Sequence, residues 1–227
     1  EAGHAVAALH MPDSDPIHKA TIIPRGRALG MVMRLPEGDR ISMSRNKLIA
    51  DLVVAMGGRI AEELVFGHGK VTTGASSDIQ MATSIARKMV TEWGLSDKLG
   101  FLRYSNNEES GYYGHSMSVS KNVSDETAKL VDQETKRIVD EAYAKCQQNL
   151  TDHRDQLETV AQGLLEFELL SGDEIKALLR GEKISRPEEG DAPRSVKPAD
   201  TVATPPAGGR SGSVPSSGGG VAPEAAG

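Results

Sequence analysis

The first four residues, Glu1-Ala2-Gly3-His4, match the second part of the helical zinc-hydrolase motif H-E-x-x-H. The two histidines of that motif are four residues apart on one face of a helix, so both imidazoles can bind one zinc ion. The glutamate after the first histidine takes a proton from the attacking water, whose pKa zinc lowers to near 7. The first histidine would stand immediately before Glu1. The motif therefore predicts Glu1 as a general base and His4 as a zinc ligand.

The same four residues have a simpler explanation, because Glu-x-x-His also occurs by chance. Residues 5–9 continue the segment as an apolar first helix, on which a histidine can pack without binding a metal. The zinc hypothesis therefore depends on the rest of the chain. Because the sequence begins inside a motif, we expect it to be part of a longer protein.

Two downstream positions could supply a further ligand. Glu62 and Glu63 lie in a segment with helical apolar spacing over residues 42–66, and many H-E-x-x-H enzymes use a downstream helical Glu. A solvated charge pair is the alternative. Asp78 lies at the start of a second helix, where Ser76 or Ser77 is the predicted N-cap and an acidic residue favours the helix dipole. Asp78 is thus either a helix-terminal charge or an oxygen ligand.

The chain resembles the peptidase domain of the FtsH family, which are membrane-anchored, ATP-dependent zinc metalloproteases. The resemblance runs from Glu1 to about Arg180, and four stretches carry it: Glu1–His4, Gly58-Arg59-Ile60-Ala61-Glu62-Glu63, Thr72-Thr73-Gly74-Ala75-Ser76-Ser77-Asp78-Ile79 and Trp93-Gly94-Leu95-Ser96-Asp97-Lys98-Leu99-Gly100. It implies that Asp78 is the zinc ligand that accompanies the two histidines, and that Glu62 and Glu63 are structural.

The resemblance also implies a setting for this domain. Such proteases form hexamers, and an upstream ATPase module feeds unfolded or misassembled proteins, membrane proteins included, to the zinc site. Upstream transmembrane helices would place the protein in the inner (plasma) membrane of a bacterium, with this domain on the cytoplasmic side. The expected cofactor of the chain is Zn²⁺, and ATP acts only through the upstream module.

The pattern of apolar residues predicts the elements that position these side chains. We expect a mainly α-helical fold with a minor β-hairpin or edge-strand element, built from residues 17–24 and 28–35. Helices are predicted over 42–66, from 78 onward, and over 124–150, 155–170 and 173–179. The adjacent glycines 57 and 58 indicate close packing of their helix on another. Residues 104–120, rich in Asn, Gly and Ser, are predicted to form a loop.

Composition narrows the class of protein. The formal net charge of −6 over 227 residues argues against non-specific nucleic-acid binding, which favours a basic surface. No apolar run reaches the roughly 20 residues of a membrane span. Cys146, the one cysteine, lies among polar neighbours and is predicted on a helix surface. Residues 186–227 hold seven of the eleven prolines and no Leu, Ile, Phe, Tyr or Trp, so we expect a domain over 1–185 and a disordered tail over 186–227.

Two rival functions remain open at the level of sequence. One is a non-catalytic helical oligomerisation module, and the other is a metal hydrolase that acts on a non-peptide substrate. For a protease, the strand in residues 28–35 could bind an extended peptide along its edge, unless its own hairpin partner or a neighbouring element fills that edge.

Overall fold

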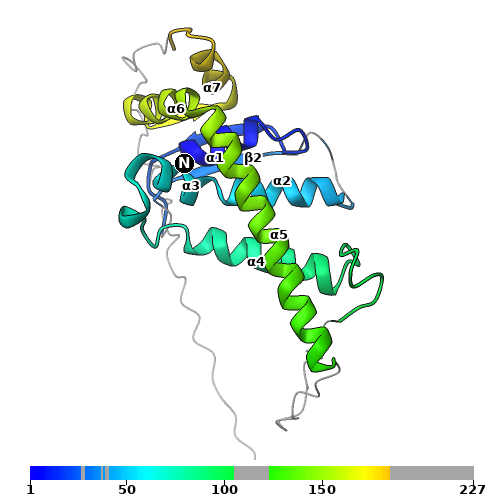
Figure 1. Cartoon of the computed structure of the whole chain (residues 1–227). Coiled ribbons are helices and arrows are strands. Elements are labelled where there is room, and N and C mark those ends of the chain that lie inside the picture. Colours follow the sequence, from blue (N-terminus) through cyan, green and yellow to red (C-terminus); the bar gives the residue numbers. More distant parts are fainter. Residues whose placement is uncertain (27–28, 37, 39–40, 105–122, 185–227) are drawn as a thin grey trace, which may run out of the picture. The chain divides into compact units, whose positions relative to one another are not determined.

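The computed structural model describes residues 1–26, 29–36, 38, 41–104 and 123–184 (Figure 1). The helices are α1 (Ala2–Leu9), α2 (Arg45–Ala55), α3 (Gly57–Phe66), the short 3-10 helix η1 (His68–Lys70), α4 (Ser76–Thr91), α5 (Asp125–Asp152), α6 (Arg154–Phe167) and α7 (Gly172–Leu179), and the strands are β1 (Ile17–Thr21), β2 (Met31–Arg34) and β3 (Leu169–Ser171). The predicted mainly α-helical fold with a minor β element is confirmed. Most of the predicted loop, residues 105–120, and the predicted tail over 186–227 lie outside the described residues.

The three strands form one antiparallel sheet in the order β2-β1-β3. β1 pairs with β2 from Ile17–Arg34 to Thr21–Met31, which confirms the predicted hairpin. On its other side β1 pairs with β3, a strand that the sequence analysis missed. Within the part of the chain that the structure describes, β2 is therefore an edge strand with one side unpaired.

The missed strand corrects the helix predicted over residues 155–170. Helix α6 ends at Phe167, because Glu168 takes a left-handed conformation with φ of 59°. A left-handed residue is a common way to end a helix. The chain then turns into β3, and Ser171 caps α7 through a reciprocal pair of hydrogen bonds with Glu174.

The single helix predicted over residues 42–66 is wrong, because α2 and α3 meet at Met56. Two glycines follow Met56 at once, and adjacent glycines weaken a helix at this point. α2 begins after Ser44, whose hydroxyl accepts a hydrogen bond from the Lys47 N–H at 3.1 Å. Because α2 ends at this junction, carbonyl groups in its last turn can accept hydrogen bonds from other parts of the chain.

Most residues of helix α1 are buried, and their small side chains allow neighbouring elements to pack closely on it. It packs on α3 at Gly3 and Gly57, and a Cβ atom on Gly3 would lie only 2.2 Å from the Gly57 carbonyl oxygen. The predicted close packing of the glycine pair is therefore confirmed. This backbone-to-backbone approach fixes α1, with Glu1 and His4 at its start, against α3.

The long helix α5 packs against α1, α2, α3, α4 and α6, and crosses the other helices diagonally in Figure 1. Its inward face includes Cys146, which is fully buried, so the predicted surface position of this cysteine is wrong. Burial raises the pKa of the thiol to about 12. The residues next to Cys146 in the sequence are polar because they lie on other, exposed faces of the same helix.

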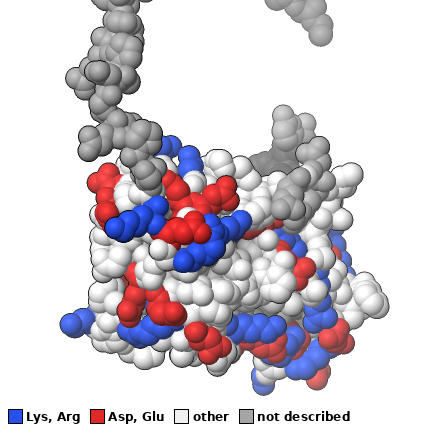
Figure 2. Space-filling model, turned by 90° about the horizontal axis from the view of Figure 1, so that it is seen from above, with Lys and Arg blue, Asp and Glu red and all other residues white. Residues whose placement is uncertain are grey.

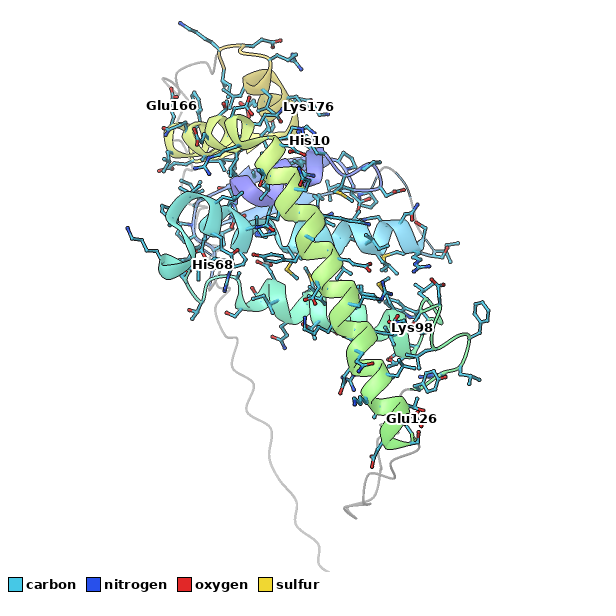
Figure 3. All side chains as sticks on the ribbon, viewed as in Figure 1. His10, His68, Lys98, Glu126, Glu166 and Lys176 are labelled. Atoms are coloured by element: carbon cyan, nitrogen blue, oxygen red, sulfur yellow. The ribbon has the colours of Figure 1, made fainter. Side chains whose placement is uncertain are left out.

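A buried carboxylate ties α5 to the segment after α4. Glu134 is 1% exposed, and it accepts hydrogen bonds from Arg137 and, at 3.0 Å, from the Ser96 hydroxyl. The Lys98 ammonium lies 2.8 Å from its other oxygen, on the segment that Figure 3 shows beside α5. These bonds, that from Arg137 first, lower the pKa of Glu134 to about 2 although burial opposes the shift.

Charged residues of both signs lie close together on part of the molecular surface (Figure 2). On the face shown in Figure 2, the Lys and Arg side chains of the described residues lie among Asp and Glu side chains. A broad basic surface of the kind that favours nucleic acid is not visible on that face. In the described part of the chain, no helix combines the length and the apolar character needed to span a membrane.

Candidate active site

His4 is held at one ring nitrogen by the end of helix α2. Its Nδ1 lies 2.8 Å from the Val54 carbonyl oxygen, which is an acceptor, so Nδ1 carries the proton and donates it. In the neutral ring, Nε2 then carries the lone pair that can bind a metal. A metal-binding histidine is usually oriented in this way, by a hydrogen bond from its other nitrogen to a carbonyl or carboxylate.

Asp78 lies opposite the free nitrogen of His4. Its Oδ2 is 3.4 Å from His4 Nε2, and the two side chains are 29% and 17% exposed. With Nδ1 already donating, the two facing atoms can share either a proton or a metal ion. The structure thus brings together two residues that are 74 positions apart in the sequence.

Asp78 reaches this position from the first turn of α4, although the predicted cap of that helix is wrong. The N-cap residue is Ala75, and its side chain makes no capping hydrogen bond. Ser76 is already helical, and its hydroxyl donates to the Thr73 carbonyl. The acidic residue in the first turn is confirmed.

Glu1 precedes α1, and its side chain makes no hydrogen bond that caps this helix. It lies beside Gly30, where a Cβ atom would come within 2.6 Å of Glu1 Cγ and 2.7 Å of Glu1 Oε1. Any side chain at position 30 would therefore displace the carboxylate. Strand β2 begins one residue later, so the glycine brings the sheet edge next to Glu1.

A cavity of about 580 Å³ joins these groups. Glu1, His4 and Asp78 all line it, together with Gly30, Met31, Val32 and Arg34 at the sheet edge and Val54, Gly58, Glu62, Ala75 and Met81 from the helices. Strand β2, whose outer edge has no strand partner among the described residues, thus forms one wall, and the predicted catalytic and ligand residues lie on the others. Residues of β2 therefore share this cavity with Glu1 and His4.

The donor set fits zinc, because an imidazole nitrogen and a carboxylate oxygen are both ordinary zinc ligands. Gly58 supports this fit, since a Cβ atom at position 58 would lie 2.7 Å from His4 Nε2 and obstruct the ligand atom. Among the described residues, no group of three or more His, Cys, Asp or Glu side chains forms a metal-binding cluster. The described residues therefore supply two facing ligand candidates, His4 and Asp78.

The two downstream glutamates point to different partners. Glu62 lines the cavity, but its carboxylate accepts hydrogen bonds from the Thr72 N–H at 3.1 Å and the Thr72 hydroxyl at 2.7 Å. Glu63 accepts a hydrogen bond from the Tyr143 hydroxyl on α5, and Glu63 Oε1 lies 3.8 Å from Nδ1 of the exposed His68. Both contacts agree with structural roles for the two residues.

The other conspicuous histidines lie away from this cavity. His10 stacks on His153, with the ring centroids 3.5 Å apart, and its Nε2 lies 2.7 Å from the Gln156 side-chain oxygen. Figure 3 shows His10 close to α6, at the opposite end of α1 from Glu1. His153 is the C-cap residue of helix α5.

The sequence analysis missed three contributors to this arrangement. Val54 acts through its carbonyl, which no side-chain pattern reveals. Gly30 and Gly58 act by leaving room beside Glu1 and His4. The glycine pair was visible in the sequence, but only the structure shows that Gly57 faces a backbone and Gly58 faces a ring.

The chain is similar to known metalloproteases over most of its length. The profile described as peptidase family M41 matches residues 1–178. The ATP-dependent zinc metalloprotease FtsH of Caulobacter vibrioides is 50% identical over 208 residues, which cover 92% of this chain and 33% of that protein. The protein of the same name from Rickettsia bellii is 53% identical over 193 residues, 85% of this chain and 30% of that protein.

A more distant relative gives the same result. The ATP-dependent zinc metalloprotease FtsH of Haemophilus influenzae is 43% identical over 199 residues, which cover 88% of this chain and 31% of that protein. The chain therefore spans about a third of the length of the curated relatives that it matches. Because the family profile covers most of the sequence and includes the residues of the cavity, this chain belongs to peptidase family M41.

Proposed function

We propose that this chain is the zinc-dependent endopeptidase domain of an ATP-dependent, membrane-anchored protease. Glu1 is the general base, and His4 and Asp78 are zinc ligands together with a histidine immediately before Glu1. One observation carries the proposal: His4 Nε2 and Asp78 Oδ2 face each other at 3.4 Å in the cavity that Glu1 also lines. The family membership supports it, because the matched relatives are named zinc metalloproteases.

The residues of the chain divide the work of peptide hydrolysis. When bound, zinc acts as a Lewis acid toward the substrate carbonyl and the attacking water. Glu1 takes the proton from this water and passes it to the leaving amine. Val54 holds His4 in the tautomer that leaves Nε2 available, and Gly58 keeps the space beside that nitrogen open.

The substrate lies as an added strand along the open edge of β2. Main-chain hydrogen bonds between strands read the backbone and not the side chains, so this mode of binding accepts many sequences. The hairpin partner β1 occupies one edge of β2, the other edge has no strand partner among the described residues, and residues of β2 line the cavity. Low sequence selectivity suits an enzyme that degrades unfolded or misassembled proteins, including membrane proteins.

The remaining features belong to the longer protein. As the resemblance to the FtsH family implies, an ATPase module uses ATP to deliver substrate, and a membrane anchor places this domain on the cytoplasmic side of the inner membrane of a bacterium. A homo-hexamer would enclose several such sites. These features depend on segments outside the present sequence.

The proposal is tested on the full-length protein with an unfolded substrate. Casein should be cleaved in the presence of ATP, chelation of zinc should stop cleavage, and added zinc should restore it. Small amides and esters that lack an extended backbone should be poor substrates, because they cannot pair with β2. Efficient hydrolysis of esters without cleavage of casein would refute the peptidase assignment.

A further inference from the structure

One turn of helix α3 holds Thr72 at all three of its polar groups. The Glu62 carboxylate accepts from the Thr72 N–H at 3.1 Å and from its hydroxyl at 2.7 Å. Arg59 Nη2 donates to the Thr72 carbonyl oxygen at 3.0 Å. We call these residues, Arg59, Glu62 and Thr72, the Thr72 anchor. It joins α3 to the segment that leads into α4.

From Thr72 a short series of hydrogen bonds reaches the first turn of α4. The Thr72 hydroxyl accepts from the Gly74 N–H at 3.2 Å, and the Thr73 carbonyl accepts from the Ser76 N–H at 3.1 Å. The Ala75 carbonyl then accepts the first helical bond, from Ile79. Asp78 lies inside this turn, so its position is set by where Thr72 is held.

Helix α3 also determines the position of His4. Gly57 meets the backbone of α1, and Gly58 lies against the His4 ring. Helix α3 therefore contacts α1 and the His4 ring through residues 57 and 58. Through residues 59 and 62 the same helix holds the segment that leads to Asp78. Helix α4 packs mainly on α5 and α2, so the Thr72 anchor is the described polar link between its N-terminal segment and α3.

We infer that Arg59 and Glu62 are positioning residues, which hold Asp78 at the distance from His4 that a shared zinc ion needs. This inference rests on the proposed role of Asp78 as a ligand. The competing assignment makes Glu62 itself a ligand, since it lines the cavity. Both of its oxygens are already engaged by Thr72, and these bonds lower the pKa of Glu62 and so stabilise the ionised acceptor that the anchor requires.

The test measures zinc affinity in the full-length protein by competition with a chromophoric chelator. Glu62→Ala should weaken zinc binding by about 10- to 100-fold, the usual effect of removing a residue that orients a metal ligand. Glu63→Ala is the matched control, because it removes the adjacent carboxylate, which bonds to Tyr143 and not to Thr72. It should leave the zinc dissociation constant unchanged. Asp78→Ala, which removes the ligand, should weaken binding most.

A second pair of variants tests the anchor without touching any carboxylate. Thr72→Val removes the hydroxyl and keeps the backbone N–H, so its zinc affinity should fall between those of the wild type and Glu62→Ala. Thr72→Ser keeps the hydroxyl and should bind zinc like the wild type. With cobalt in place of zinc at saturation, Glu62→Ala and Thr72→Val should shift the visible absorption bands, because a displaced Asp78 changes the ligand geometry, whereas Glu63→Ala should not.

The outcomes separate this inference from the proposed function. If Asp78→Ala loses zinc while Glu62→Ala and Glu63→Ala behave alike, the anchor has no positioning role and the ligand assignment stands. If Glu62→Ala loses zinc as fully as Asp78→Ala and Thr72→Val has no effect, Glu62 is a ligand and the inference is wrong. If Asp78→Ala binds zinc normally, both proposals fail. Should Glu62→Ala not fold, the Thr72→Val and Thr72→Ser pair decides the question.

Discussion

Glu1 lines the cavity beside Gly30, where a Cβ atom would come within 2.7 Å of the Glu1 carboxylate. Glu1→Gln keeps the shape of the side chain and removes the base. We expect this variant of the full-length protein to retain zinc and to lose about 10² to 10⁴ in the rate of casein cleavage. Metal analysis and a turnover assay on the same preparation check both parts. More than about a tenth of the wild-type turnover would contradict the general-base assignment.

Gly58 gives a second test at the scale of single residues. In Gly58→Ala the new methyl group would lie 2.7 Å from His4 Nε2, so the ring must shift. We expect zinc occupancy to fall, even though alanine favours a helix over glycine by about 1 kcal/mol. Gly69→Ala is the control, because a Cβ atom there meets nothing within 4 Å. Equal zinc content in the two variants would show that the ring is not constrained by residue 58.

Among the elements, strand β2 is the one that we propose to pair with the substrate. Val32→Pro removes one main-chain donor from this strand. We expect the KM for casein to rise while zinc content and helicity change little. Val32→Thr keeps the donor and a β-branched side chain, so it should cleave casein like the wild type. If the proline variant also binds a peptide-hydroxamate inhibitor and cleaves casein normally, the substrate does not pair with this edge.

Glu134 connects helix α5 to the segment after α4 through its contacts with Ser96 and Lys98. Glu134→Gln should lower the free energy of unfolding by about 1.5 to 3 kcal/mol, the usual range for hydrogen bonds to a charged group. Glu141→Gln is the matched control, because Glu141 bonds to the same Arg137 but is exposed. Its loss should cost no more than about 1 kcal/mol. Chemical denaturation of the two variants measures both values.

The same carboxylate predicts a dependence of stability on pH. Its pKa is about 2 in the folded protein, below the ordinary value of 4.5. The ionised group therefore stabilises the fold fully above pH 4.5, and this contribution disappears as the pH falls through 2. The difference in stability between wild type and Glu134→Gln should shrink over that interval. A difference that stays constant down to pH 2 would rule out the shifted ionisation.

The elements also show which patterns can be read from sequence. The hairpin of β1 and β2, helix α5 and the start of α7 follow from alternation, apolar spacing and capping residues, which are local signals. β3 was not predictable in this way, because three residues become a strand only when β1 pairs with them. The junction at Met56 also depends on a distant contact, the packing of Gly3 on Gly57.

At the scale of the whole molecule, the sequence motif and the resemblance predicted Glu1, His4 and Asp78, and the structure places all three on one cavity. The supporting groups could not be predicted, because their roles depend on distance and not on residue type. Val54 contributes a carbonyl, and Thr72 is held by a helix about ten residues earlier in the chain. The family match covers residues 1–178, whereas this chain spans only 33% of the relative from Caulobacter vibrioides.

Cys146 gives this domain a natural reporter of its own opening. The thiol is fully buried on α5, with a pKa raised to about 12, and it is the one cysteine of the sequence. A thiol reagent can therefore react only when α5 separates from the helices packed on it, and the labelling rate measures the population of that open state. Because a ligand that binds the folded form lowers this population, zinc should slow the labelling of Cys146 although the metal never touches it.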